Sequence, residues 1–369
     1  MDDSGGRQSV VVLGGGYGGI RVAKALDDVA DVTLVDPSDA FVHNVAAWRA
    51  LVEPQWLDQI FMPYDQLLAR GTFVRDRAEA VDGTRVTLAS GRTLEPDYLV
   101  LATGSAYPFP AKSDVADTET ARAKYRDAHR DLLDAQRVLL VGAGPAGLEL
   151  AGEIKAFFPG KHVTIADVAP DILPGPYAQE LRDELRGQLD KLGVELVLGS
   201  PLRGLPSAPP AIAAPIAIST EAGDEVAADI WYRCFGVTVQ TGYARGTLAE
   251  ARDDRGYLRV DEQLRVQGQE RVFAVGDISD ADRDTAGMAT AQAETVSAAI
   301  RSRITGEEAP AAYQRGPVMI LVPLGPEGGA GQLPGNDGIL GADEASGIKG
   351  RTMLVDRYTA LFDAPGAGA

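Results

Sequence analysis

The chain has 369 residues, of which 45% are hydrophobic, and its 53 acidic and 35 basic side chains give a formal net charge of −18. A chain of this length and composition suits two or three globular domains. The negative charge argues against nucleic acid or an anionic membrane as the main partner, because both repel an acidic surface. The sequence contains no run of about 18 apolar residues, so it predicts no transmembrane helix. We therefore expect a soluble, cytoplasmic protein.

The single cysteine, Cys234, limits the redox chemistry that side chains can perform. One cysteine allows no intramolecular disulfide and no C-x-x-C relay, so a disulfide reductase is excluded unless a partner supplies the thiols. We expect Cys234 to be a small buried hydrophobe. The sequence has no H-E-x-x-H pattern and no Cys/His cluster, so it predicts no metal site.

The segment Ser9–Asp36 predicts a dinucleotide-binding unit of strand, glycine turn, helix and strand. Its glycine-rich turn, which fits the pattern G-x-G-x-x-G, contains Gly14, Gly16, Gly18 and Gly19. In that pattern the first glycine allows a tight turn, the second lets a diphosphate approach the backbone, and the last lets helix and strand pack closely. The diphosphate would lie at the N-terminus of the helix. Asp36, at the end of the second strand, would accept a hydrogen bond from a ribose hydroxyl.

Further along the chain, short strands are expected at 72–75, 78–81 and 85–88, with a hairpin turn at Asp82-Gly83. A buried strand, 98–102, then ends at Thr103-Gly104. Prolines follow this strand and mark a crossover to a second domain.

The opening unit recurs after a surface helix expected at 117–135. The apolar strand 137–141 leads into a second G-x-G-x-x-G turn, with its glycines at Gly142, Gly144 and Gly147. A helix and the strand 162–166 follow, and that strand ends at Asp167. This internal duplication predicts a second dinucleotide site.

Two later strands also end in glycine, at Gly236 and at Gly276-Asp277. A small-residue helix is expected at 286–304, and it contains Gln292. The remaining chain predicts a strand at 318–322, a glycine-rich loop at 325–341 and a last segment at 351–362.

Two dinucleotide sites in one chain imply electron transfer between two dinucleotides, and the natural pair is a tightly held FAD with an exchangeable nicotinamide nucleotide. Such a reaction needs no protein nucleophile. An acid at the end of the second strand of the second unit hydrogen-bonds a 2′-hydroxyl but repels a 2′-phosphate. Asp167 therefore predicts NADH rather than NADPH as the electron donor.

The glycine turns, the strands ending at Thr103-Gly104 and Gly236, and the Val275-Gly276-Asp277 segment resemble the two-dinucleotide flavoprotein reductases of the pyridine nucleotide oxidoreductase superfamily. The resemblance implies an α/β fold like that of glutathione reductase, with two Rossmann-like domains, small β-meanders and a short C-terminal α+β domain. It implies that Asp277 binds the FAD ribitol. On this basis we expect an FAD-binding domain in two parts, at 1–112 and 237–310. A nicotinamide-nucleotide domain is expected at 113–236, and a C-terminal domain at 311–369.

Within this superfamily, the segments 41–50, 147–155 and 325–335 are similar to the ferroptosis suppressor family. On side-chain chemistry alone, His43 and Asn44 read as a helix-capping pair; the resemblance implies instead that they belong to the flavin site, with Arg49 contacting the cofactor. Glu149 is expected in the first turn of the helix after the second glycine turn, where it would complement the helix dipole. The resemblance implies that it lies beside the nicotinamide, and both roles can hold at once. Gln292 resembles a residue on the quinone side of type II NADH dehydrogenases.

The resemblance implies oxidation of NAD(P)H by FAD and two-electron reduction of a quinone, with His43, Asn44, Glu149 and Gln292 as catalytic residues. Vertebrate members of this family begin Met-Gly and are lipid-anchored, whereas this chain begins Met1-Asp2. Weak peripheral membrane contact and a monomeric or homodimeric state both stay open. Two alternatives also remain: reduction of a soluble acceptor, such as an iron–sulfur protein, a radical or a natural-product quinone, and a non-catalytic FAD/NADH redox sensor.

Overall fold

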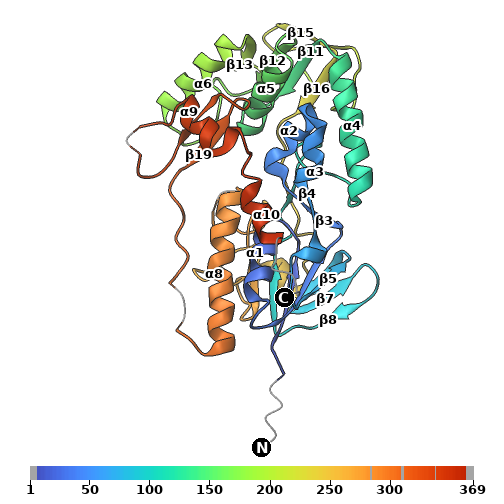
Figure 1. The fold of residues 1–369 in the computed structure, drawn as a ribbon, viewed down its shortest axis with the longest axis vertical. Helices are drawn as coiled ribbons and strands as arrows, with labels where there is room; N and C mark the ends of the chain where they lie inside the picture. Colours follow the sequence, from blue (N-terminus) through green and yellow to red (C-terminus); the bar gives the residue numbers. More distant parts are fainter. Residues whose placement is uncertain (1–5, 283–284, 309–310, 337, 363–369) are drawn as a thin grey trace, which may run out of the picture.

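Two parallel sheets organise the computed structural model, which describes residues 6–282, 285–308, 311–336 and 338–362. Figure 1 shows them in the lower and upper halves of the molecule. The predicted α/β class with two Rossmann-like units is confirmed. The chain start at Met1-Asp2 and the last seven residues of the expected 311–369 domain lie outside the described residues.

The first sheet has five parallel strands in the order β18-β9-β1-β2-β5. Its strands are β1 (Ser9–Leu13), β2 (Asp31–Asp36), β5 (Thr72–Arg75), β9 (Tyr98–Leu101) and β18 (Val272–Ala274). Helix α1 (Tyr17–Leu26) follows β1, and α8 (Ala286–Thr305) packs against α1. The last strand and α8 come from the distant second half of the chain, so this unit is assembled from two separate segments.

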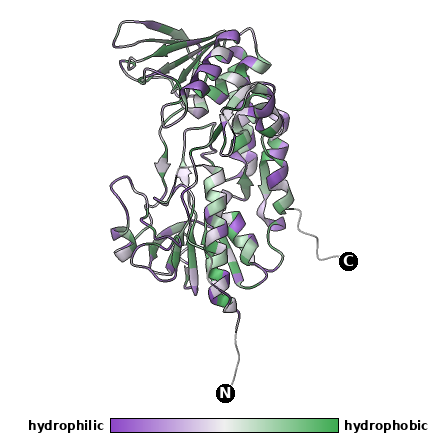
Figure 2. Ribbon diagram, turned by 90° about the vertical axis from the view of Figure 1, so that its left-hand side faces the viewer, coloured by the Kyte–Doolittle hydropathy of each residue, from purple (hydrophilic) through white to green (hydrophobic). Residues whose placement is uncertain are grey.

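The second sheet repeats the design with four parallel strands in the order β13-β12-β11-β16. Its strands are β11 (Arg137–Val141), β12 (His162–Asp167), β13 (Val194–Leu198) and β16 (Ile230–Arg233). Its helices are α4 (Thr118–Asp134), α5 (Pro145–Phe157) and α6 (Gln179–Lys191). In Figure 2 hydrophilic and hydrophobic residues alternate along the helices, as expected where one helix face is buried.

Smaller elements connect and cover the two sheets. Antiparallel pairs are β3 (Ala40–Val42) with β4 (Phe61–Pro63), β10 (Ser105–Ala106) with β17 (Thr238–Val239), β14 (Ile216–Ser219) with β15 (Glu225–Ala228), and the meander β6 (Ala78–Asp82), β7 (Arg85–Leu88) and β8 (Thr93–Leu94). Short helices are η1 (Asn44–Ala46), α2 (Ala47–Val52), η2 (Pro54–Trp56), α3 (Leu57–Ile60), η3 (Tyr64–Gln66) and α7 (Gly246–Glu250). The pairing of β10 with β17 lies at the two chain crossings between the units, as the prolines after Thr103-Gly104 predicted.

The C-terminal segment spans both units. It contains β19 (Ile320–Pro323), β20 (Gly329–Gln332), α9 (Ala342–Ala345), η4 (Ser346–Gly350) and α10 (Asp356–Phe362). Figure 1 shows it beside α5 and α6 in the upper half and beside α1 and α8 in the lower half. The expected glycine-rich loop at 325–341 is wrong in part, because β20 pairs with β19 there. A Cβ on Gly329 would lie 2.4 Å from the Val322 carbonyl oxygen, so glycine lets these strands approach.

A buried ion pair joins the two units and the C-terminal segment. Arg49 on α2 donates to Glu153 on α5 through Nε at 2.6 Å and Nη2 at 2.9 Å, and Nη2 also donates to the Gly350 carbonyl at 2.9 Å. The two side chains are 2% and 1% exposed. Burial raises the pKa of Glu153, and the guanidinium opposes that rise.

None of the helices in the described part of the chain has the length and hydrophobicity needed to span a membrane.

We expect Glu153→Gln to lower the free energy of unfolding by about 3 kcal/mol, the low end of the range for breaking a buried pair, because it leaves the buried Arg49 guanidinium with the Glu53 carboxylate, 3.8 Å away, as its remaining charged partner among the described residues. Chemical denaturation would measure the loss. The matched control is Glu327→Gln, which breaks the exposed Arg351–Glu327 pair and should leave the free energy of unfolding nearly unchanged, because solvent screens an exposed ion pair. Equal losses in the two variants would contradict the role assigned to the buried pair.

Candidate active site

A cavity of about 810 Å³ lies where the two units meet. One wall is the first glycine turn with the ends of β2, β9 and β18, including Gly14, Asp36, Thr103 and Asp277. Another wall carries Pro145, Ala146 and Glu149 of α5, which follows the second glycine turn. The cavity therefore runs from the first dinucleotide turn to the helix that begins at the second.

The two glycine turns have the same geometry. Gly14 and Gly142 have φ of +101° and +117°, which favour glycine. A Cβ on Gly19 would lie 1.8 Å from the Gly14 carbonyl oxygen, and one on Gly147 would lie 1.9 Å from that of Gly142. In the part of the chain that the structure describes, a Cβ on Gly16 or Gly144 would have no heavy atom within 4 Å other than those of the adjacent residues. Each turn is thus tightly packed at its first and last glycines and open at its second glycine, where a diphosphate could approach the backbone.

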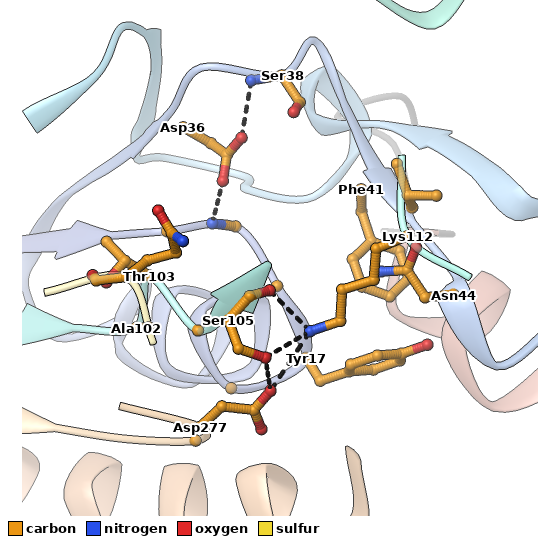
Figure 3. A pocket seen from close by; sticks show the side chains of 18 of the residues that line it. Tyr17, Asp36, Ser38, Phe41, Asn44, Ala102, Thr103, Ser105, Lys112 and Asp277 are labelled. Carbon is orange, nitrogen blue, oxygen red and sulfur yellow. Dashed lines mark hydrogen bonds and ion pairs between the residues drawn. The ribbon is translucent and has the colours of Figure 1, made fainter. Parts of the chain in front are cut away.

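The two acids at the strand ends also make equivalent hydrogen bonds. Asp36 accepts from the Gly15 amide at 2.6 Å and the Ser38 amide at 2.7 Å (Figure 3). Asp167 accepts from the Ala143 amide at 2.6 Å and the Ala169 amide at 2.7 Å. Each carboxylate therefore braces its own glycine turn, and its remaining lone pairs can accept from a ribose hydroxyl.

The structure brings ten of the predicted site residues to the cavity wall. They are Gly14, Gly16, Gly18, Asp36, Asn44, Thr103, Gly104, Glu149, Gly276 and Asp277. Gly19 packs behind the first turn, while Gly142, Gly144, Gly147 and Asp167 form the second turn next to this cavity. Gly236 has φ +98° and precedes Val237, which does line the wall.

Asn44 does not act as the helix cap that its side-chain chemistry suggests. The short helix that it begins has no side-chain cap, and the Asn44 Oδ1 atom is buried without a hydrogen-bond partner among the residues that the structure describes. A buried acceptor without a donor costs free energy. Since Asn44 lines the cavity, this oxygen can accept from a bound ligand.

Glu149 lies one turn further along α5 than predicted, because no acid occupies the first turn of that helix. Its Oε1 atom lies 2.7 Å from the Lys349 ammonium of the C-terminal segment. The dipole interpretation of Glu149 is therefore wrong. The partner lies 200 residues away in the sequence, and no local pattern identifies it.

Arg49 and Gln292, both predicted to act in the site, lie outside the lining of this cavity. Arg49 is held by Glu153. Gln292 is 1% exposed, and its Oε1 accepts from the Gly276 amide at 2.7 Å and the Ser279 hydroxyl at 3.0 Å. It therefore braces the turn that presents Asp277.

His43 is fully buried behind the cavity wall. Its Nε2 lies 2.7 Å from the Met353 carbonyl, which can only accept, so Nε2 carries the proton. Its Nδ1 then accepts from the Tyr17 hydroxyl at 3.2 Å, and that oxygen accepts from the Val45 amide at 3.0 Å. Tyr17 lines the cavity, so His43 connects the wall to the C-terminal segment. Burial lowers the pKa of His43 from 6.5 to about 4.

Four wall residues carry no recognisable sequence signal: Tyr17, Ser105, Tyr107 and Lys112. Lys112 lies between β10 and α4, and its ammonium donates to Ser105 near Asp277 (Figure 3).

Cys234 is buried as predicted, and burial raises the pKa of its thiol.

The lowered pKa of His43 predicts a loss of stability in acid. Between pH 7 and 5 the unfolded chain binds a proton at this imidazole that the folded chain does not, so the free energy of unfolding falls by about 2 kcal/mol from this group. Denaturation at both pH values should show a smaller fall for His43→Gln. Removing the exposed imidazole in His162→Gln should leave the fall unchanged. The same fall in wild type and His43→Gln would contradict the assignment.

Comparison with known proteins agrees with this geometry. Residues 8–302 match the family described as pyridine nucleotide-disulphide oxidoreductase. Ferroptosis suppressor protein 1 from Taeniopygia guttata is 32% identical over 336 residues, covering 89% of this chain and 90% of that protein. Apoptosis-inducing factor homolog B from Dictyostelium discoideum is 28% identical, covering 97% and 98%.

Solved structures share the fold at low sequence identity. NDH2 from Plasmodium falciparum in complex with NADH has a TM-score of 0.77 at 14% identity, covering 97% of this chain and 95% of that one. The sulfide:quinone oxidoreductase from Aquifex aeolicus has a TM-score of 0.73 at 18% identity, covering 96% and 91%. The resemblance predicted from the sequence is confirmed: the chain belongs to the pyridine nucleotide-disulphide oxidoreductase family.

Proposed function

We propose that this protein is an FAD-dependent NADH oxidoreductase that passes two electrons to a quinone-like small molecule. One observation carries the proposal: a single cavity is lined both by the first glycine turn and by the helix after the second. A flavin nucleotide on the first turn and a nicotinamide nucleotide on the second would meet there. In this proposal the domain of residues 1–112 and 237–310 holds FAD, the domain of residues 113–236 holds NADH, and residues 311–369 form the C-terminal domain.

The residues present fit a flavin dinucleotide. The cavity volume of about 810 Å³ lies in the range of cofactor pockets. The backbone at Gly16 is open toward a diphosphate, Asp36 offers a carboxylate to a ribose, and the unpaired Asn44 oxygen offers an acceptor. A bound flavin supplies hydride acceptance from a nicotinamide and electron delivery to an acceptor.

The remaining residues position and shield the reactants. Asp277 presents a carboxylate beside Ser105, and Gln292 holds the turn that carries it. Glu149 projects into the region between the two turns and is held there by Lys349. His43 and Arg49 act from behind the wall as positioning residues.

A quinone-like acceptor agrees better with this chain than a disulfide does. One solved structure of the same fold is named as a sulfide:quinone oxidoreductase, and another, NDH2, was solved with NADH. Disulfide chemistry needs a pair of thiols, whereas this chain has only Cys234, which is buried. The net charge of −18 favours a second candidate, reduction of a soluble acceptor, because it disfavours approach to an anionic membrane.

The deciding experiment mixes the purified, yellow holoprotein with NADH without oxygen, follows bleaching of the flavin, and then adds a short-chain ubiquinone. We expect rapid bleaching and reoxidation by the quinone. Bleaching without reoxidation would favour a protein acceptor or a redox sensor. A protein purified without flavin that also fails to take up added FAD would contradict the proposal.

We also propose that Asp167 selects NADH. Its carboxylate would repel a 2′-phosphate, so kcat/KM for NADH should exceed that for NADPH by roughly tenfold or more. Asp167→Asn, which removes the charge and keeps an acceptor for the Ala143 amide, should narrow that ratio. Thermal unfolding of this variant would show whether the turn stays intact. Equal efficiency of the wild type with both nucleotides would contradict this assignment.

A further inference from the structure

A lysine reaches the cavity from outside both glycine turns. Lys112 Nζ donates to the Ser105 carbonyl and hydroxyl oxygens, both at 2.8 Å, and lies 3.4 Å from Asp277 Oδ2. The Ser105 hydroxyl donates to the same Asp277 oxygen at 2.5 Å. Figure 3 shows these three side chains converging on one wall, next to Tyr17. We call Lys112, Ser105 and Asp277 the lysine cluster.

Lys112 supplies the cation at its end of the cavity. The other basic residue in the described lining, Arg77, lies near Asp36; burial raises the pKa of that carboxyl, and the Arg77 charge opposes the rise. The carboxylate of Glu149 already has Lys349 as its partner. Lys112 donates to Ser105 at 2.8 Å and forms an ion pair with Asp277 at the longer distance of 3.4 Å, so its ammonium is held at the wall by an uncharged partner and remains close to any group bound in the cavity.

The chemistry of hydride transfer gives this charge a use. A hydride carries two electrons and one proton, so it adds one negative charge to the group that accepts it. A cation fixed at the wall of a protein cavity stabilises such a charge more than a mobile ion in bulk water does. The N-terminus of α8, with Ala286 and Ala289 on the same cavity wall, adds a positive dipole end.

We propose that Lys112 stabilises the reduced form of the flavin in this cavity relative to the oxidised form. This inference rests on the proposed function. It assigns Lys112 to the reaction through its charge, and it assigns Ser105 the task of holding the ammonium in place. A purely structural lysine would affect both redox forms of the flavin equally.

The experiment measures the reduction potential of the bound flavin by equilibration with a redox dye of known potential, without oxygen. In Lys112→Met the reduced form should be destabilised relative to the oxidised form by roughly tenfold, the effect of losing one charge-assisted contact, which corresponds to about 30 mV for a two-electron couple. Lys112→Arg should restore most of the potential. The matched control is Lys124→Met, because the Lys124 ammonium is held by Asp114 outside the cavity lining. This control variant should leave the reduction potential unchanged.

A second variant covers the case in which Lys112→Met loses its flavin. Lys112→Gln can still donate to Ser105 but has no charge, and titration of apoprotein with FAD would confirm that it is loaded. A wild-type potential in Lys112→Gln, or in a loaded Lys112→Met, would overturn the inference. Wild-type protein that binds no flavin or is not bleached by NADH would instead defeat the proposed function, so the two failures are distinguishable.

Discussion

The ion pair between Arg49 and Glu153 is the constraint on which the rest of the structure depends. It joins α2 of the first unit to α5 of the second, and the same guanidinium binds the carbonyl of Gly350 in the C-terminal segment. The rings of Trp56 and Phe157 lie 5.1 and 5.3 Å from the guanidinium carbon. A buried charge is tolerated only when its partner stays in place. Glu149, one helical turn before Glu153, therefore reaches the cavity at a defined position.

The two dinucleotide units solve one backbone problem twice. In each, a strand must turn sharply, leave its upper surface open and let a helix start against it. The close approach of Gly19 to Gly14, and of Gly147 to Gly142, leaves no space for a Cβ. An acid one strand away then binds the amide that follows the first glycine. The requirement is local and steric, so the same residue types recur at the same spacing.

This locality explains how much of the fold and site could be predicted. Both strand–turn–helix units, their glycines and the acids at their strand ends follow from short-range spacing and lie where that spacing predicts them. His43, Arg49 and Gln292 were assigned to the cavity by resemblance, whereas their partners place them behind its wall: Met353, Glu153 and the Gly276 amide. These contacts join segments between 16 and 310 residues apart. Residue type and spacing carry no information about contacts at such distances.

The cavity therefore combines two kinds of residue with different origins. The glycine turns provide a backbone frame that suits the diphosphate of any dinucleotide, and the strand-end acids suit a ribose without a 2′-phosphate. The cations that meet the cavity carboxylates come from elsewhere: Lys112 from the crossover before α4 and Lys349 from the C-terminal segment. If Lys112 acts as proposed, charge at that end can change through these segments while the turns, whose packed glycines leave no space for a Cβ, stay the same. Under the proposed function, the electron affinity of the flavin would then depend on the connecting and C-terminal segments more than on the dinucleotide turns.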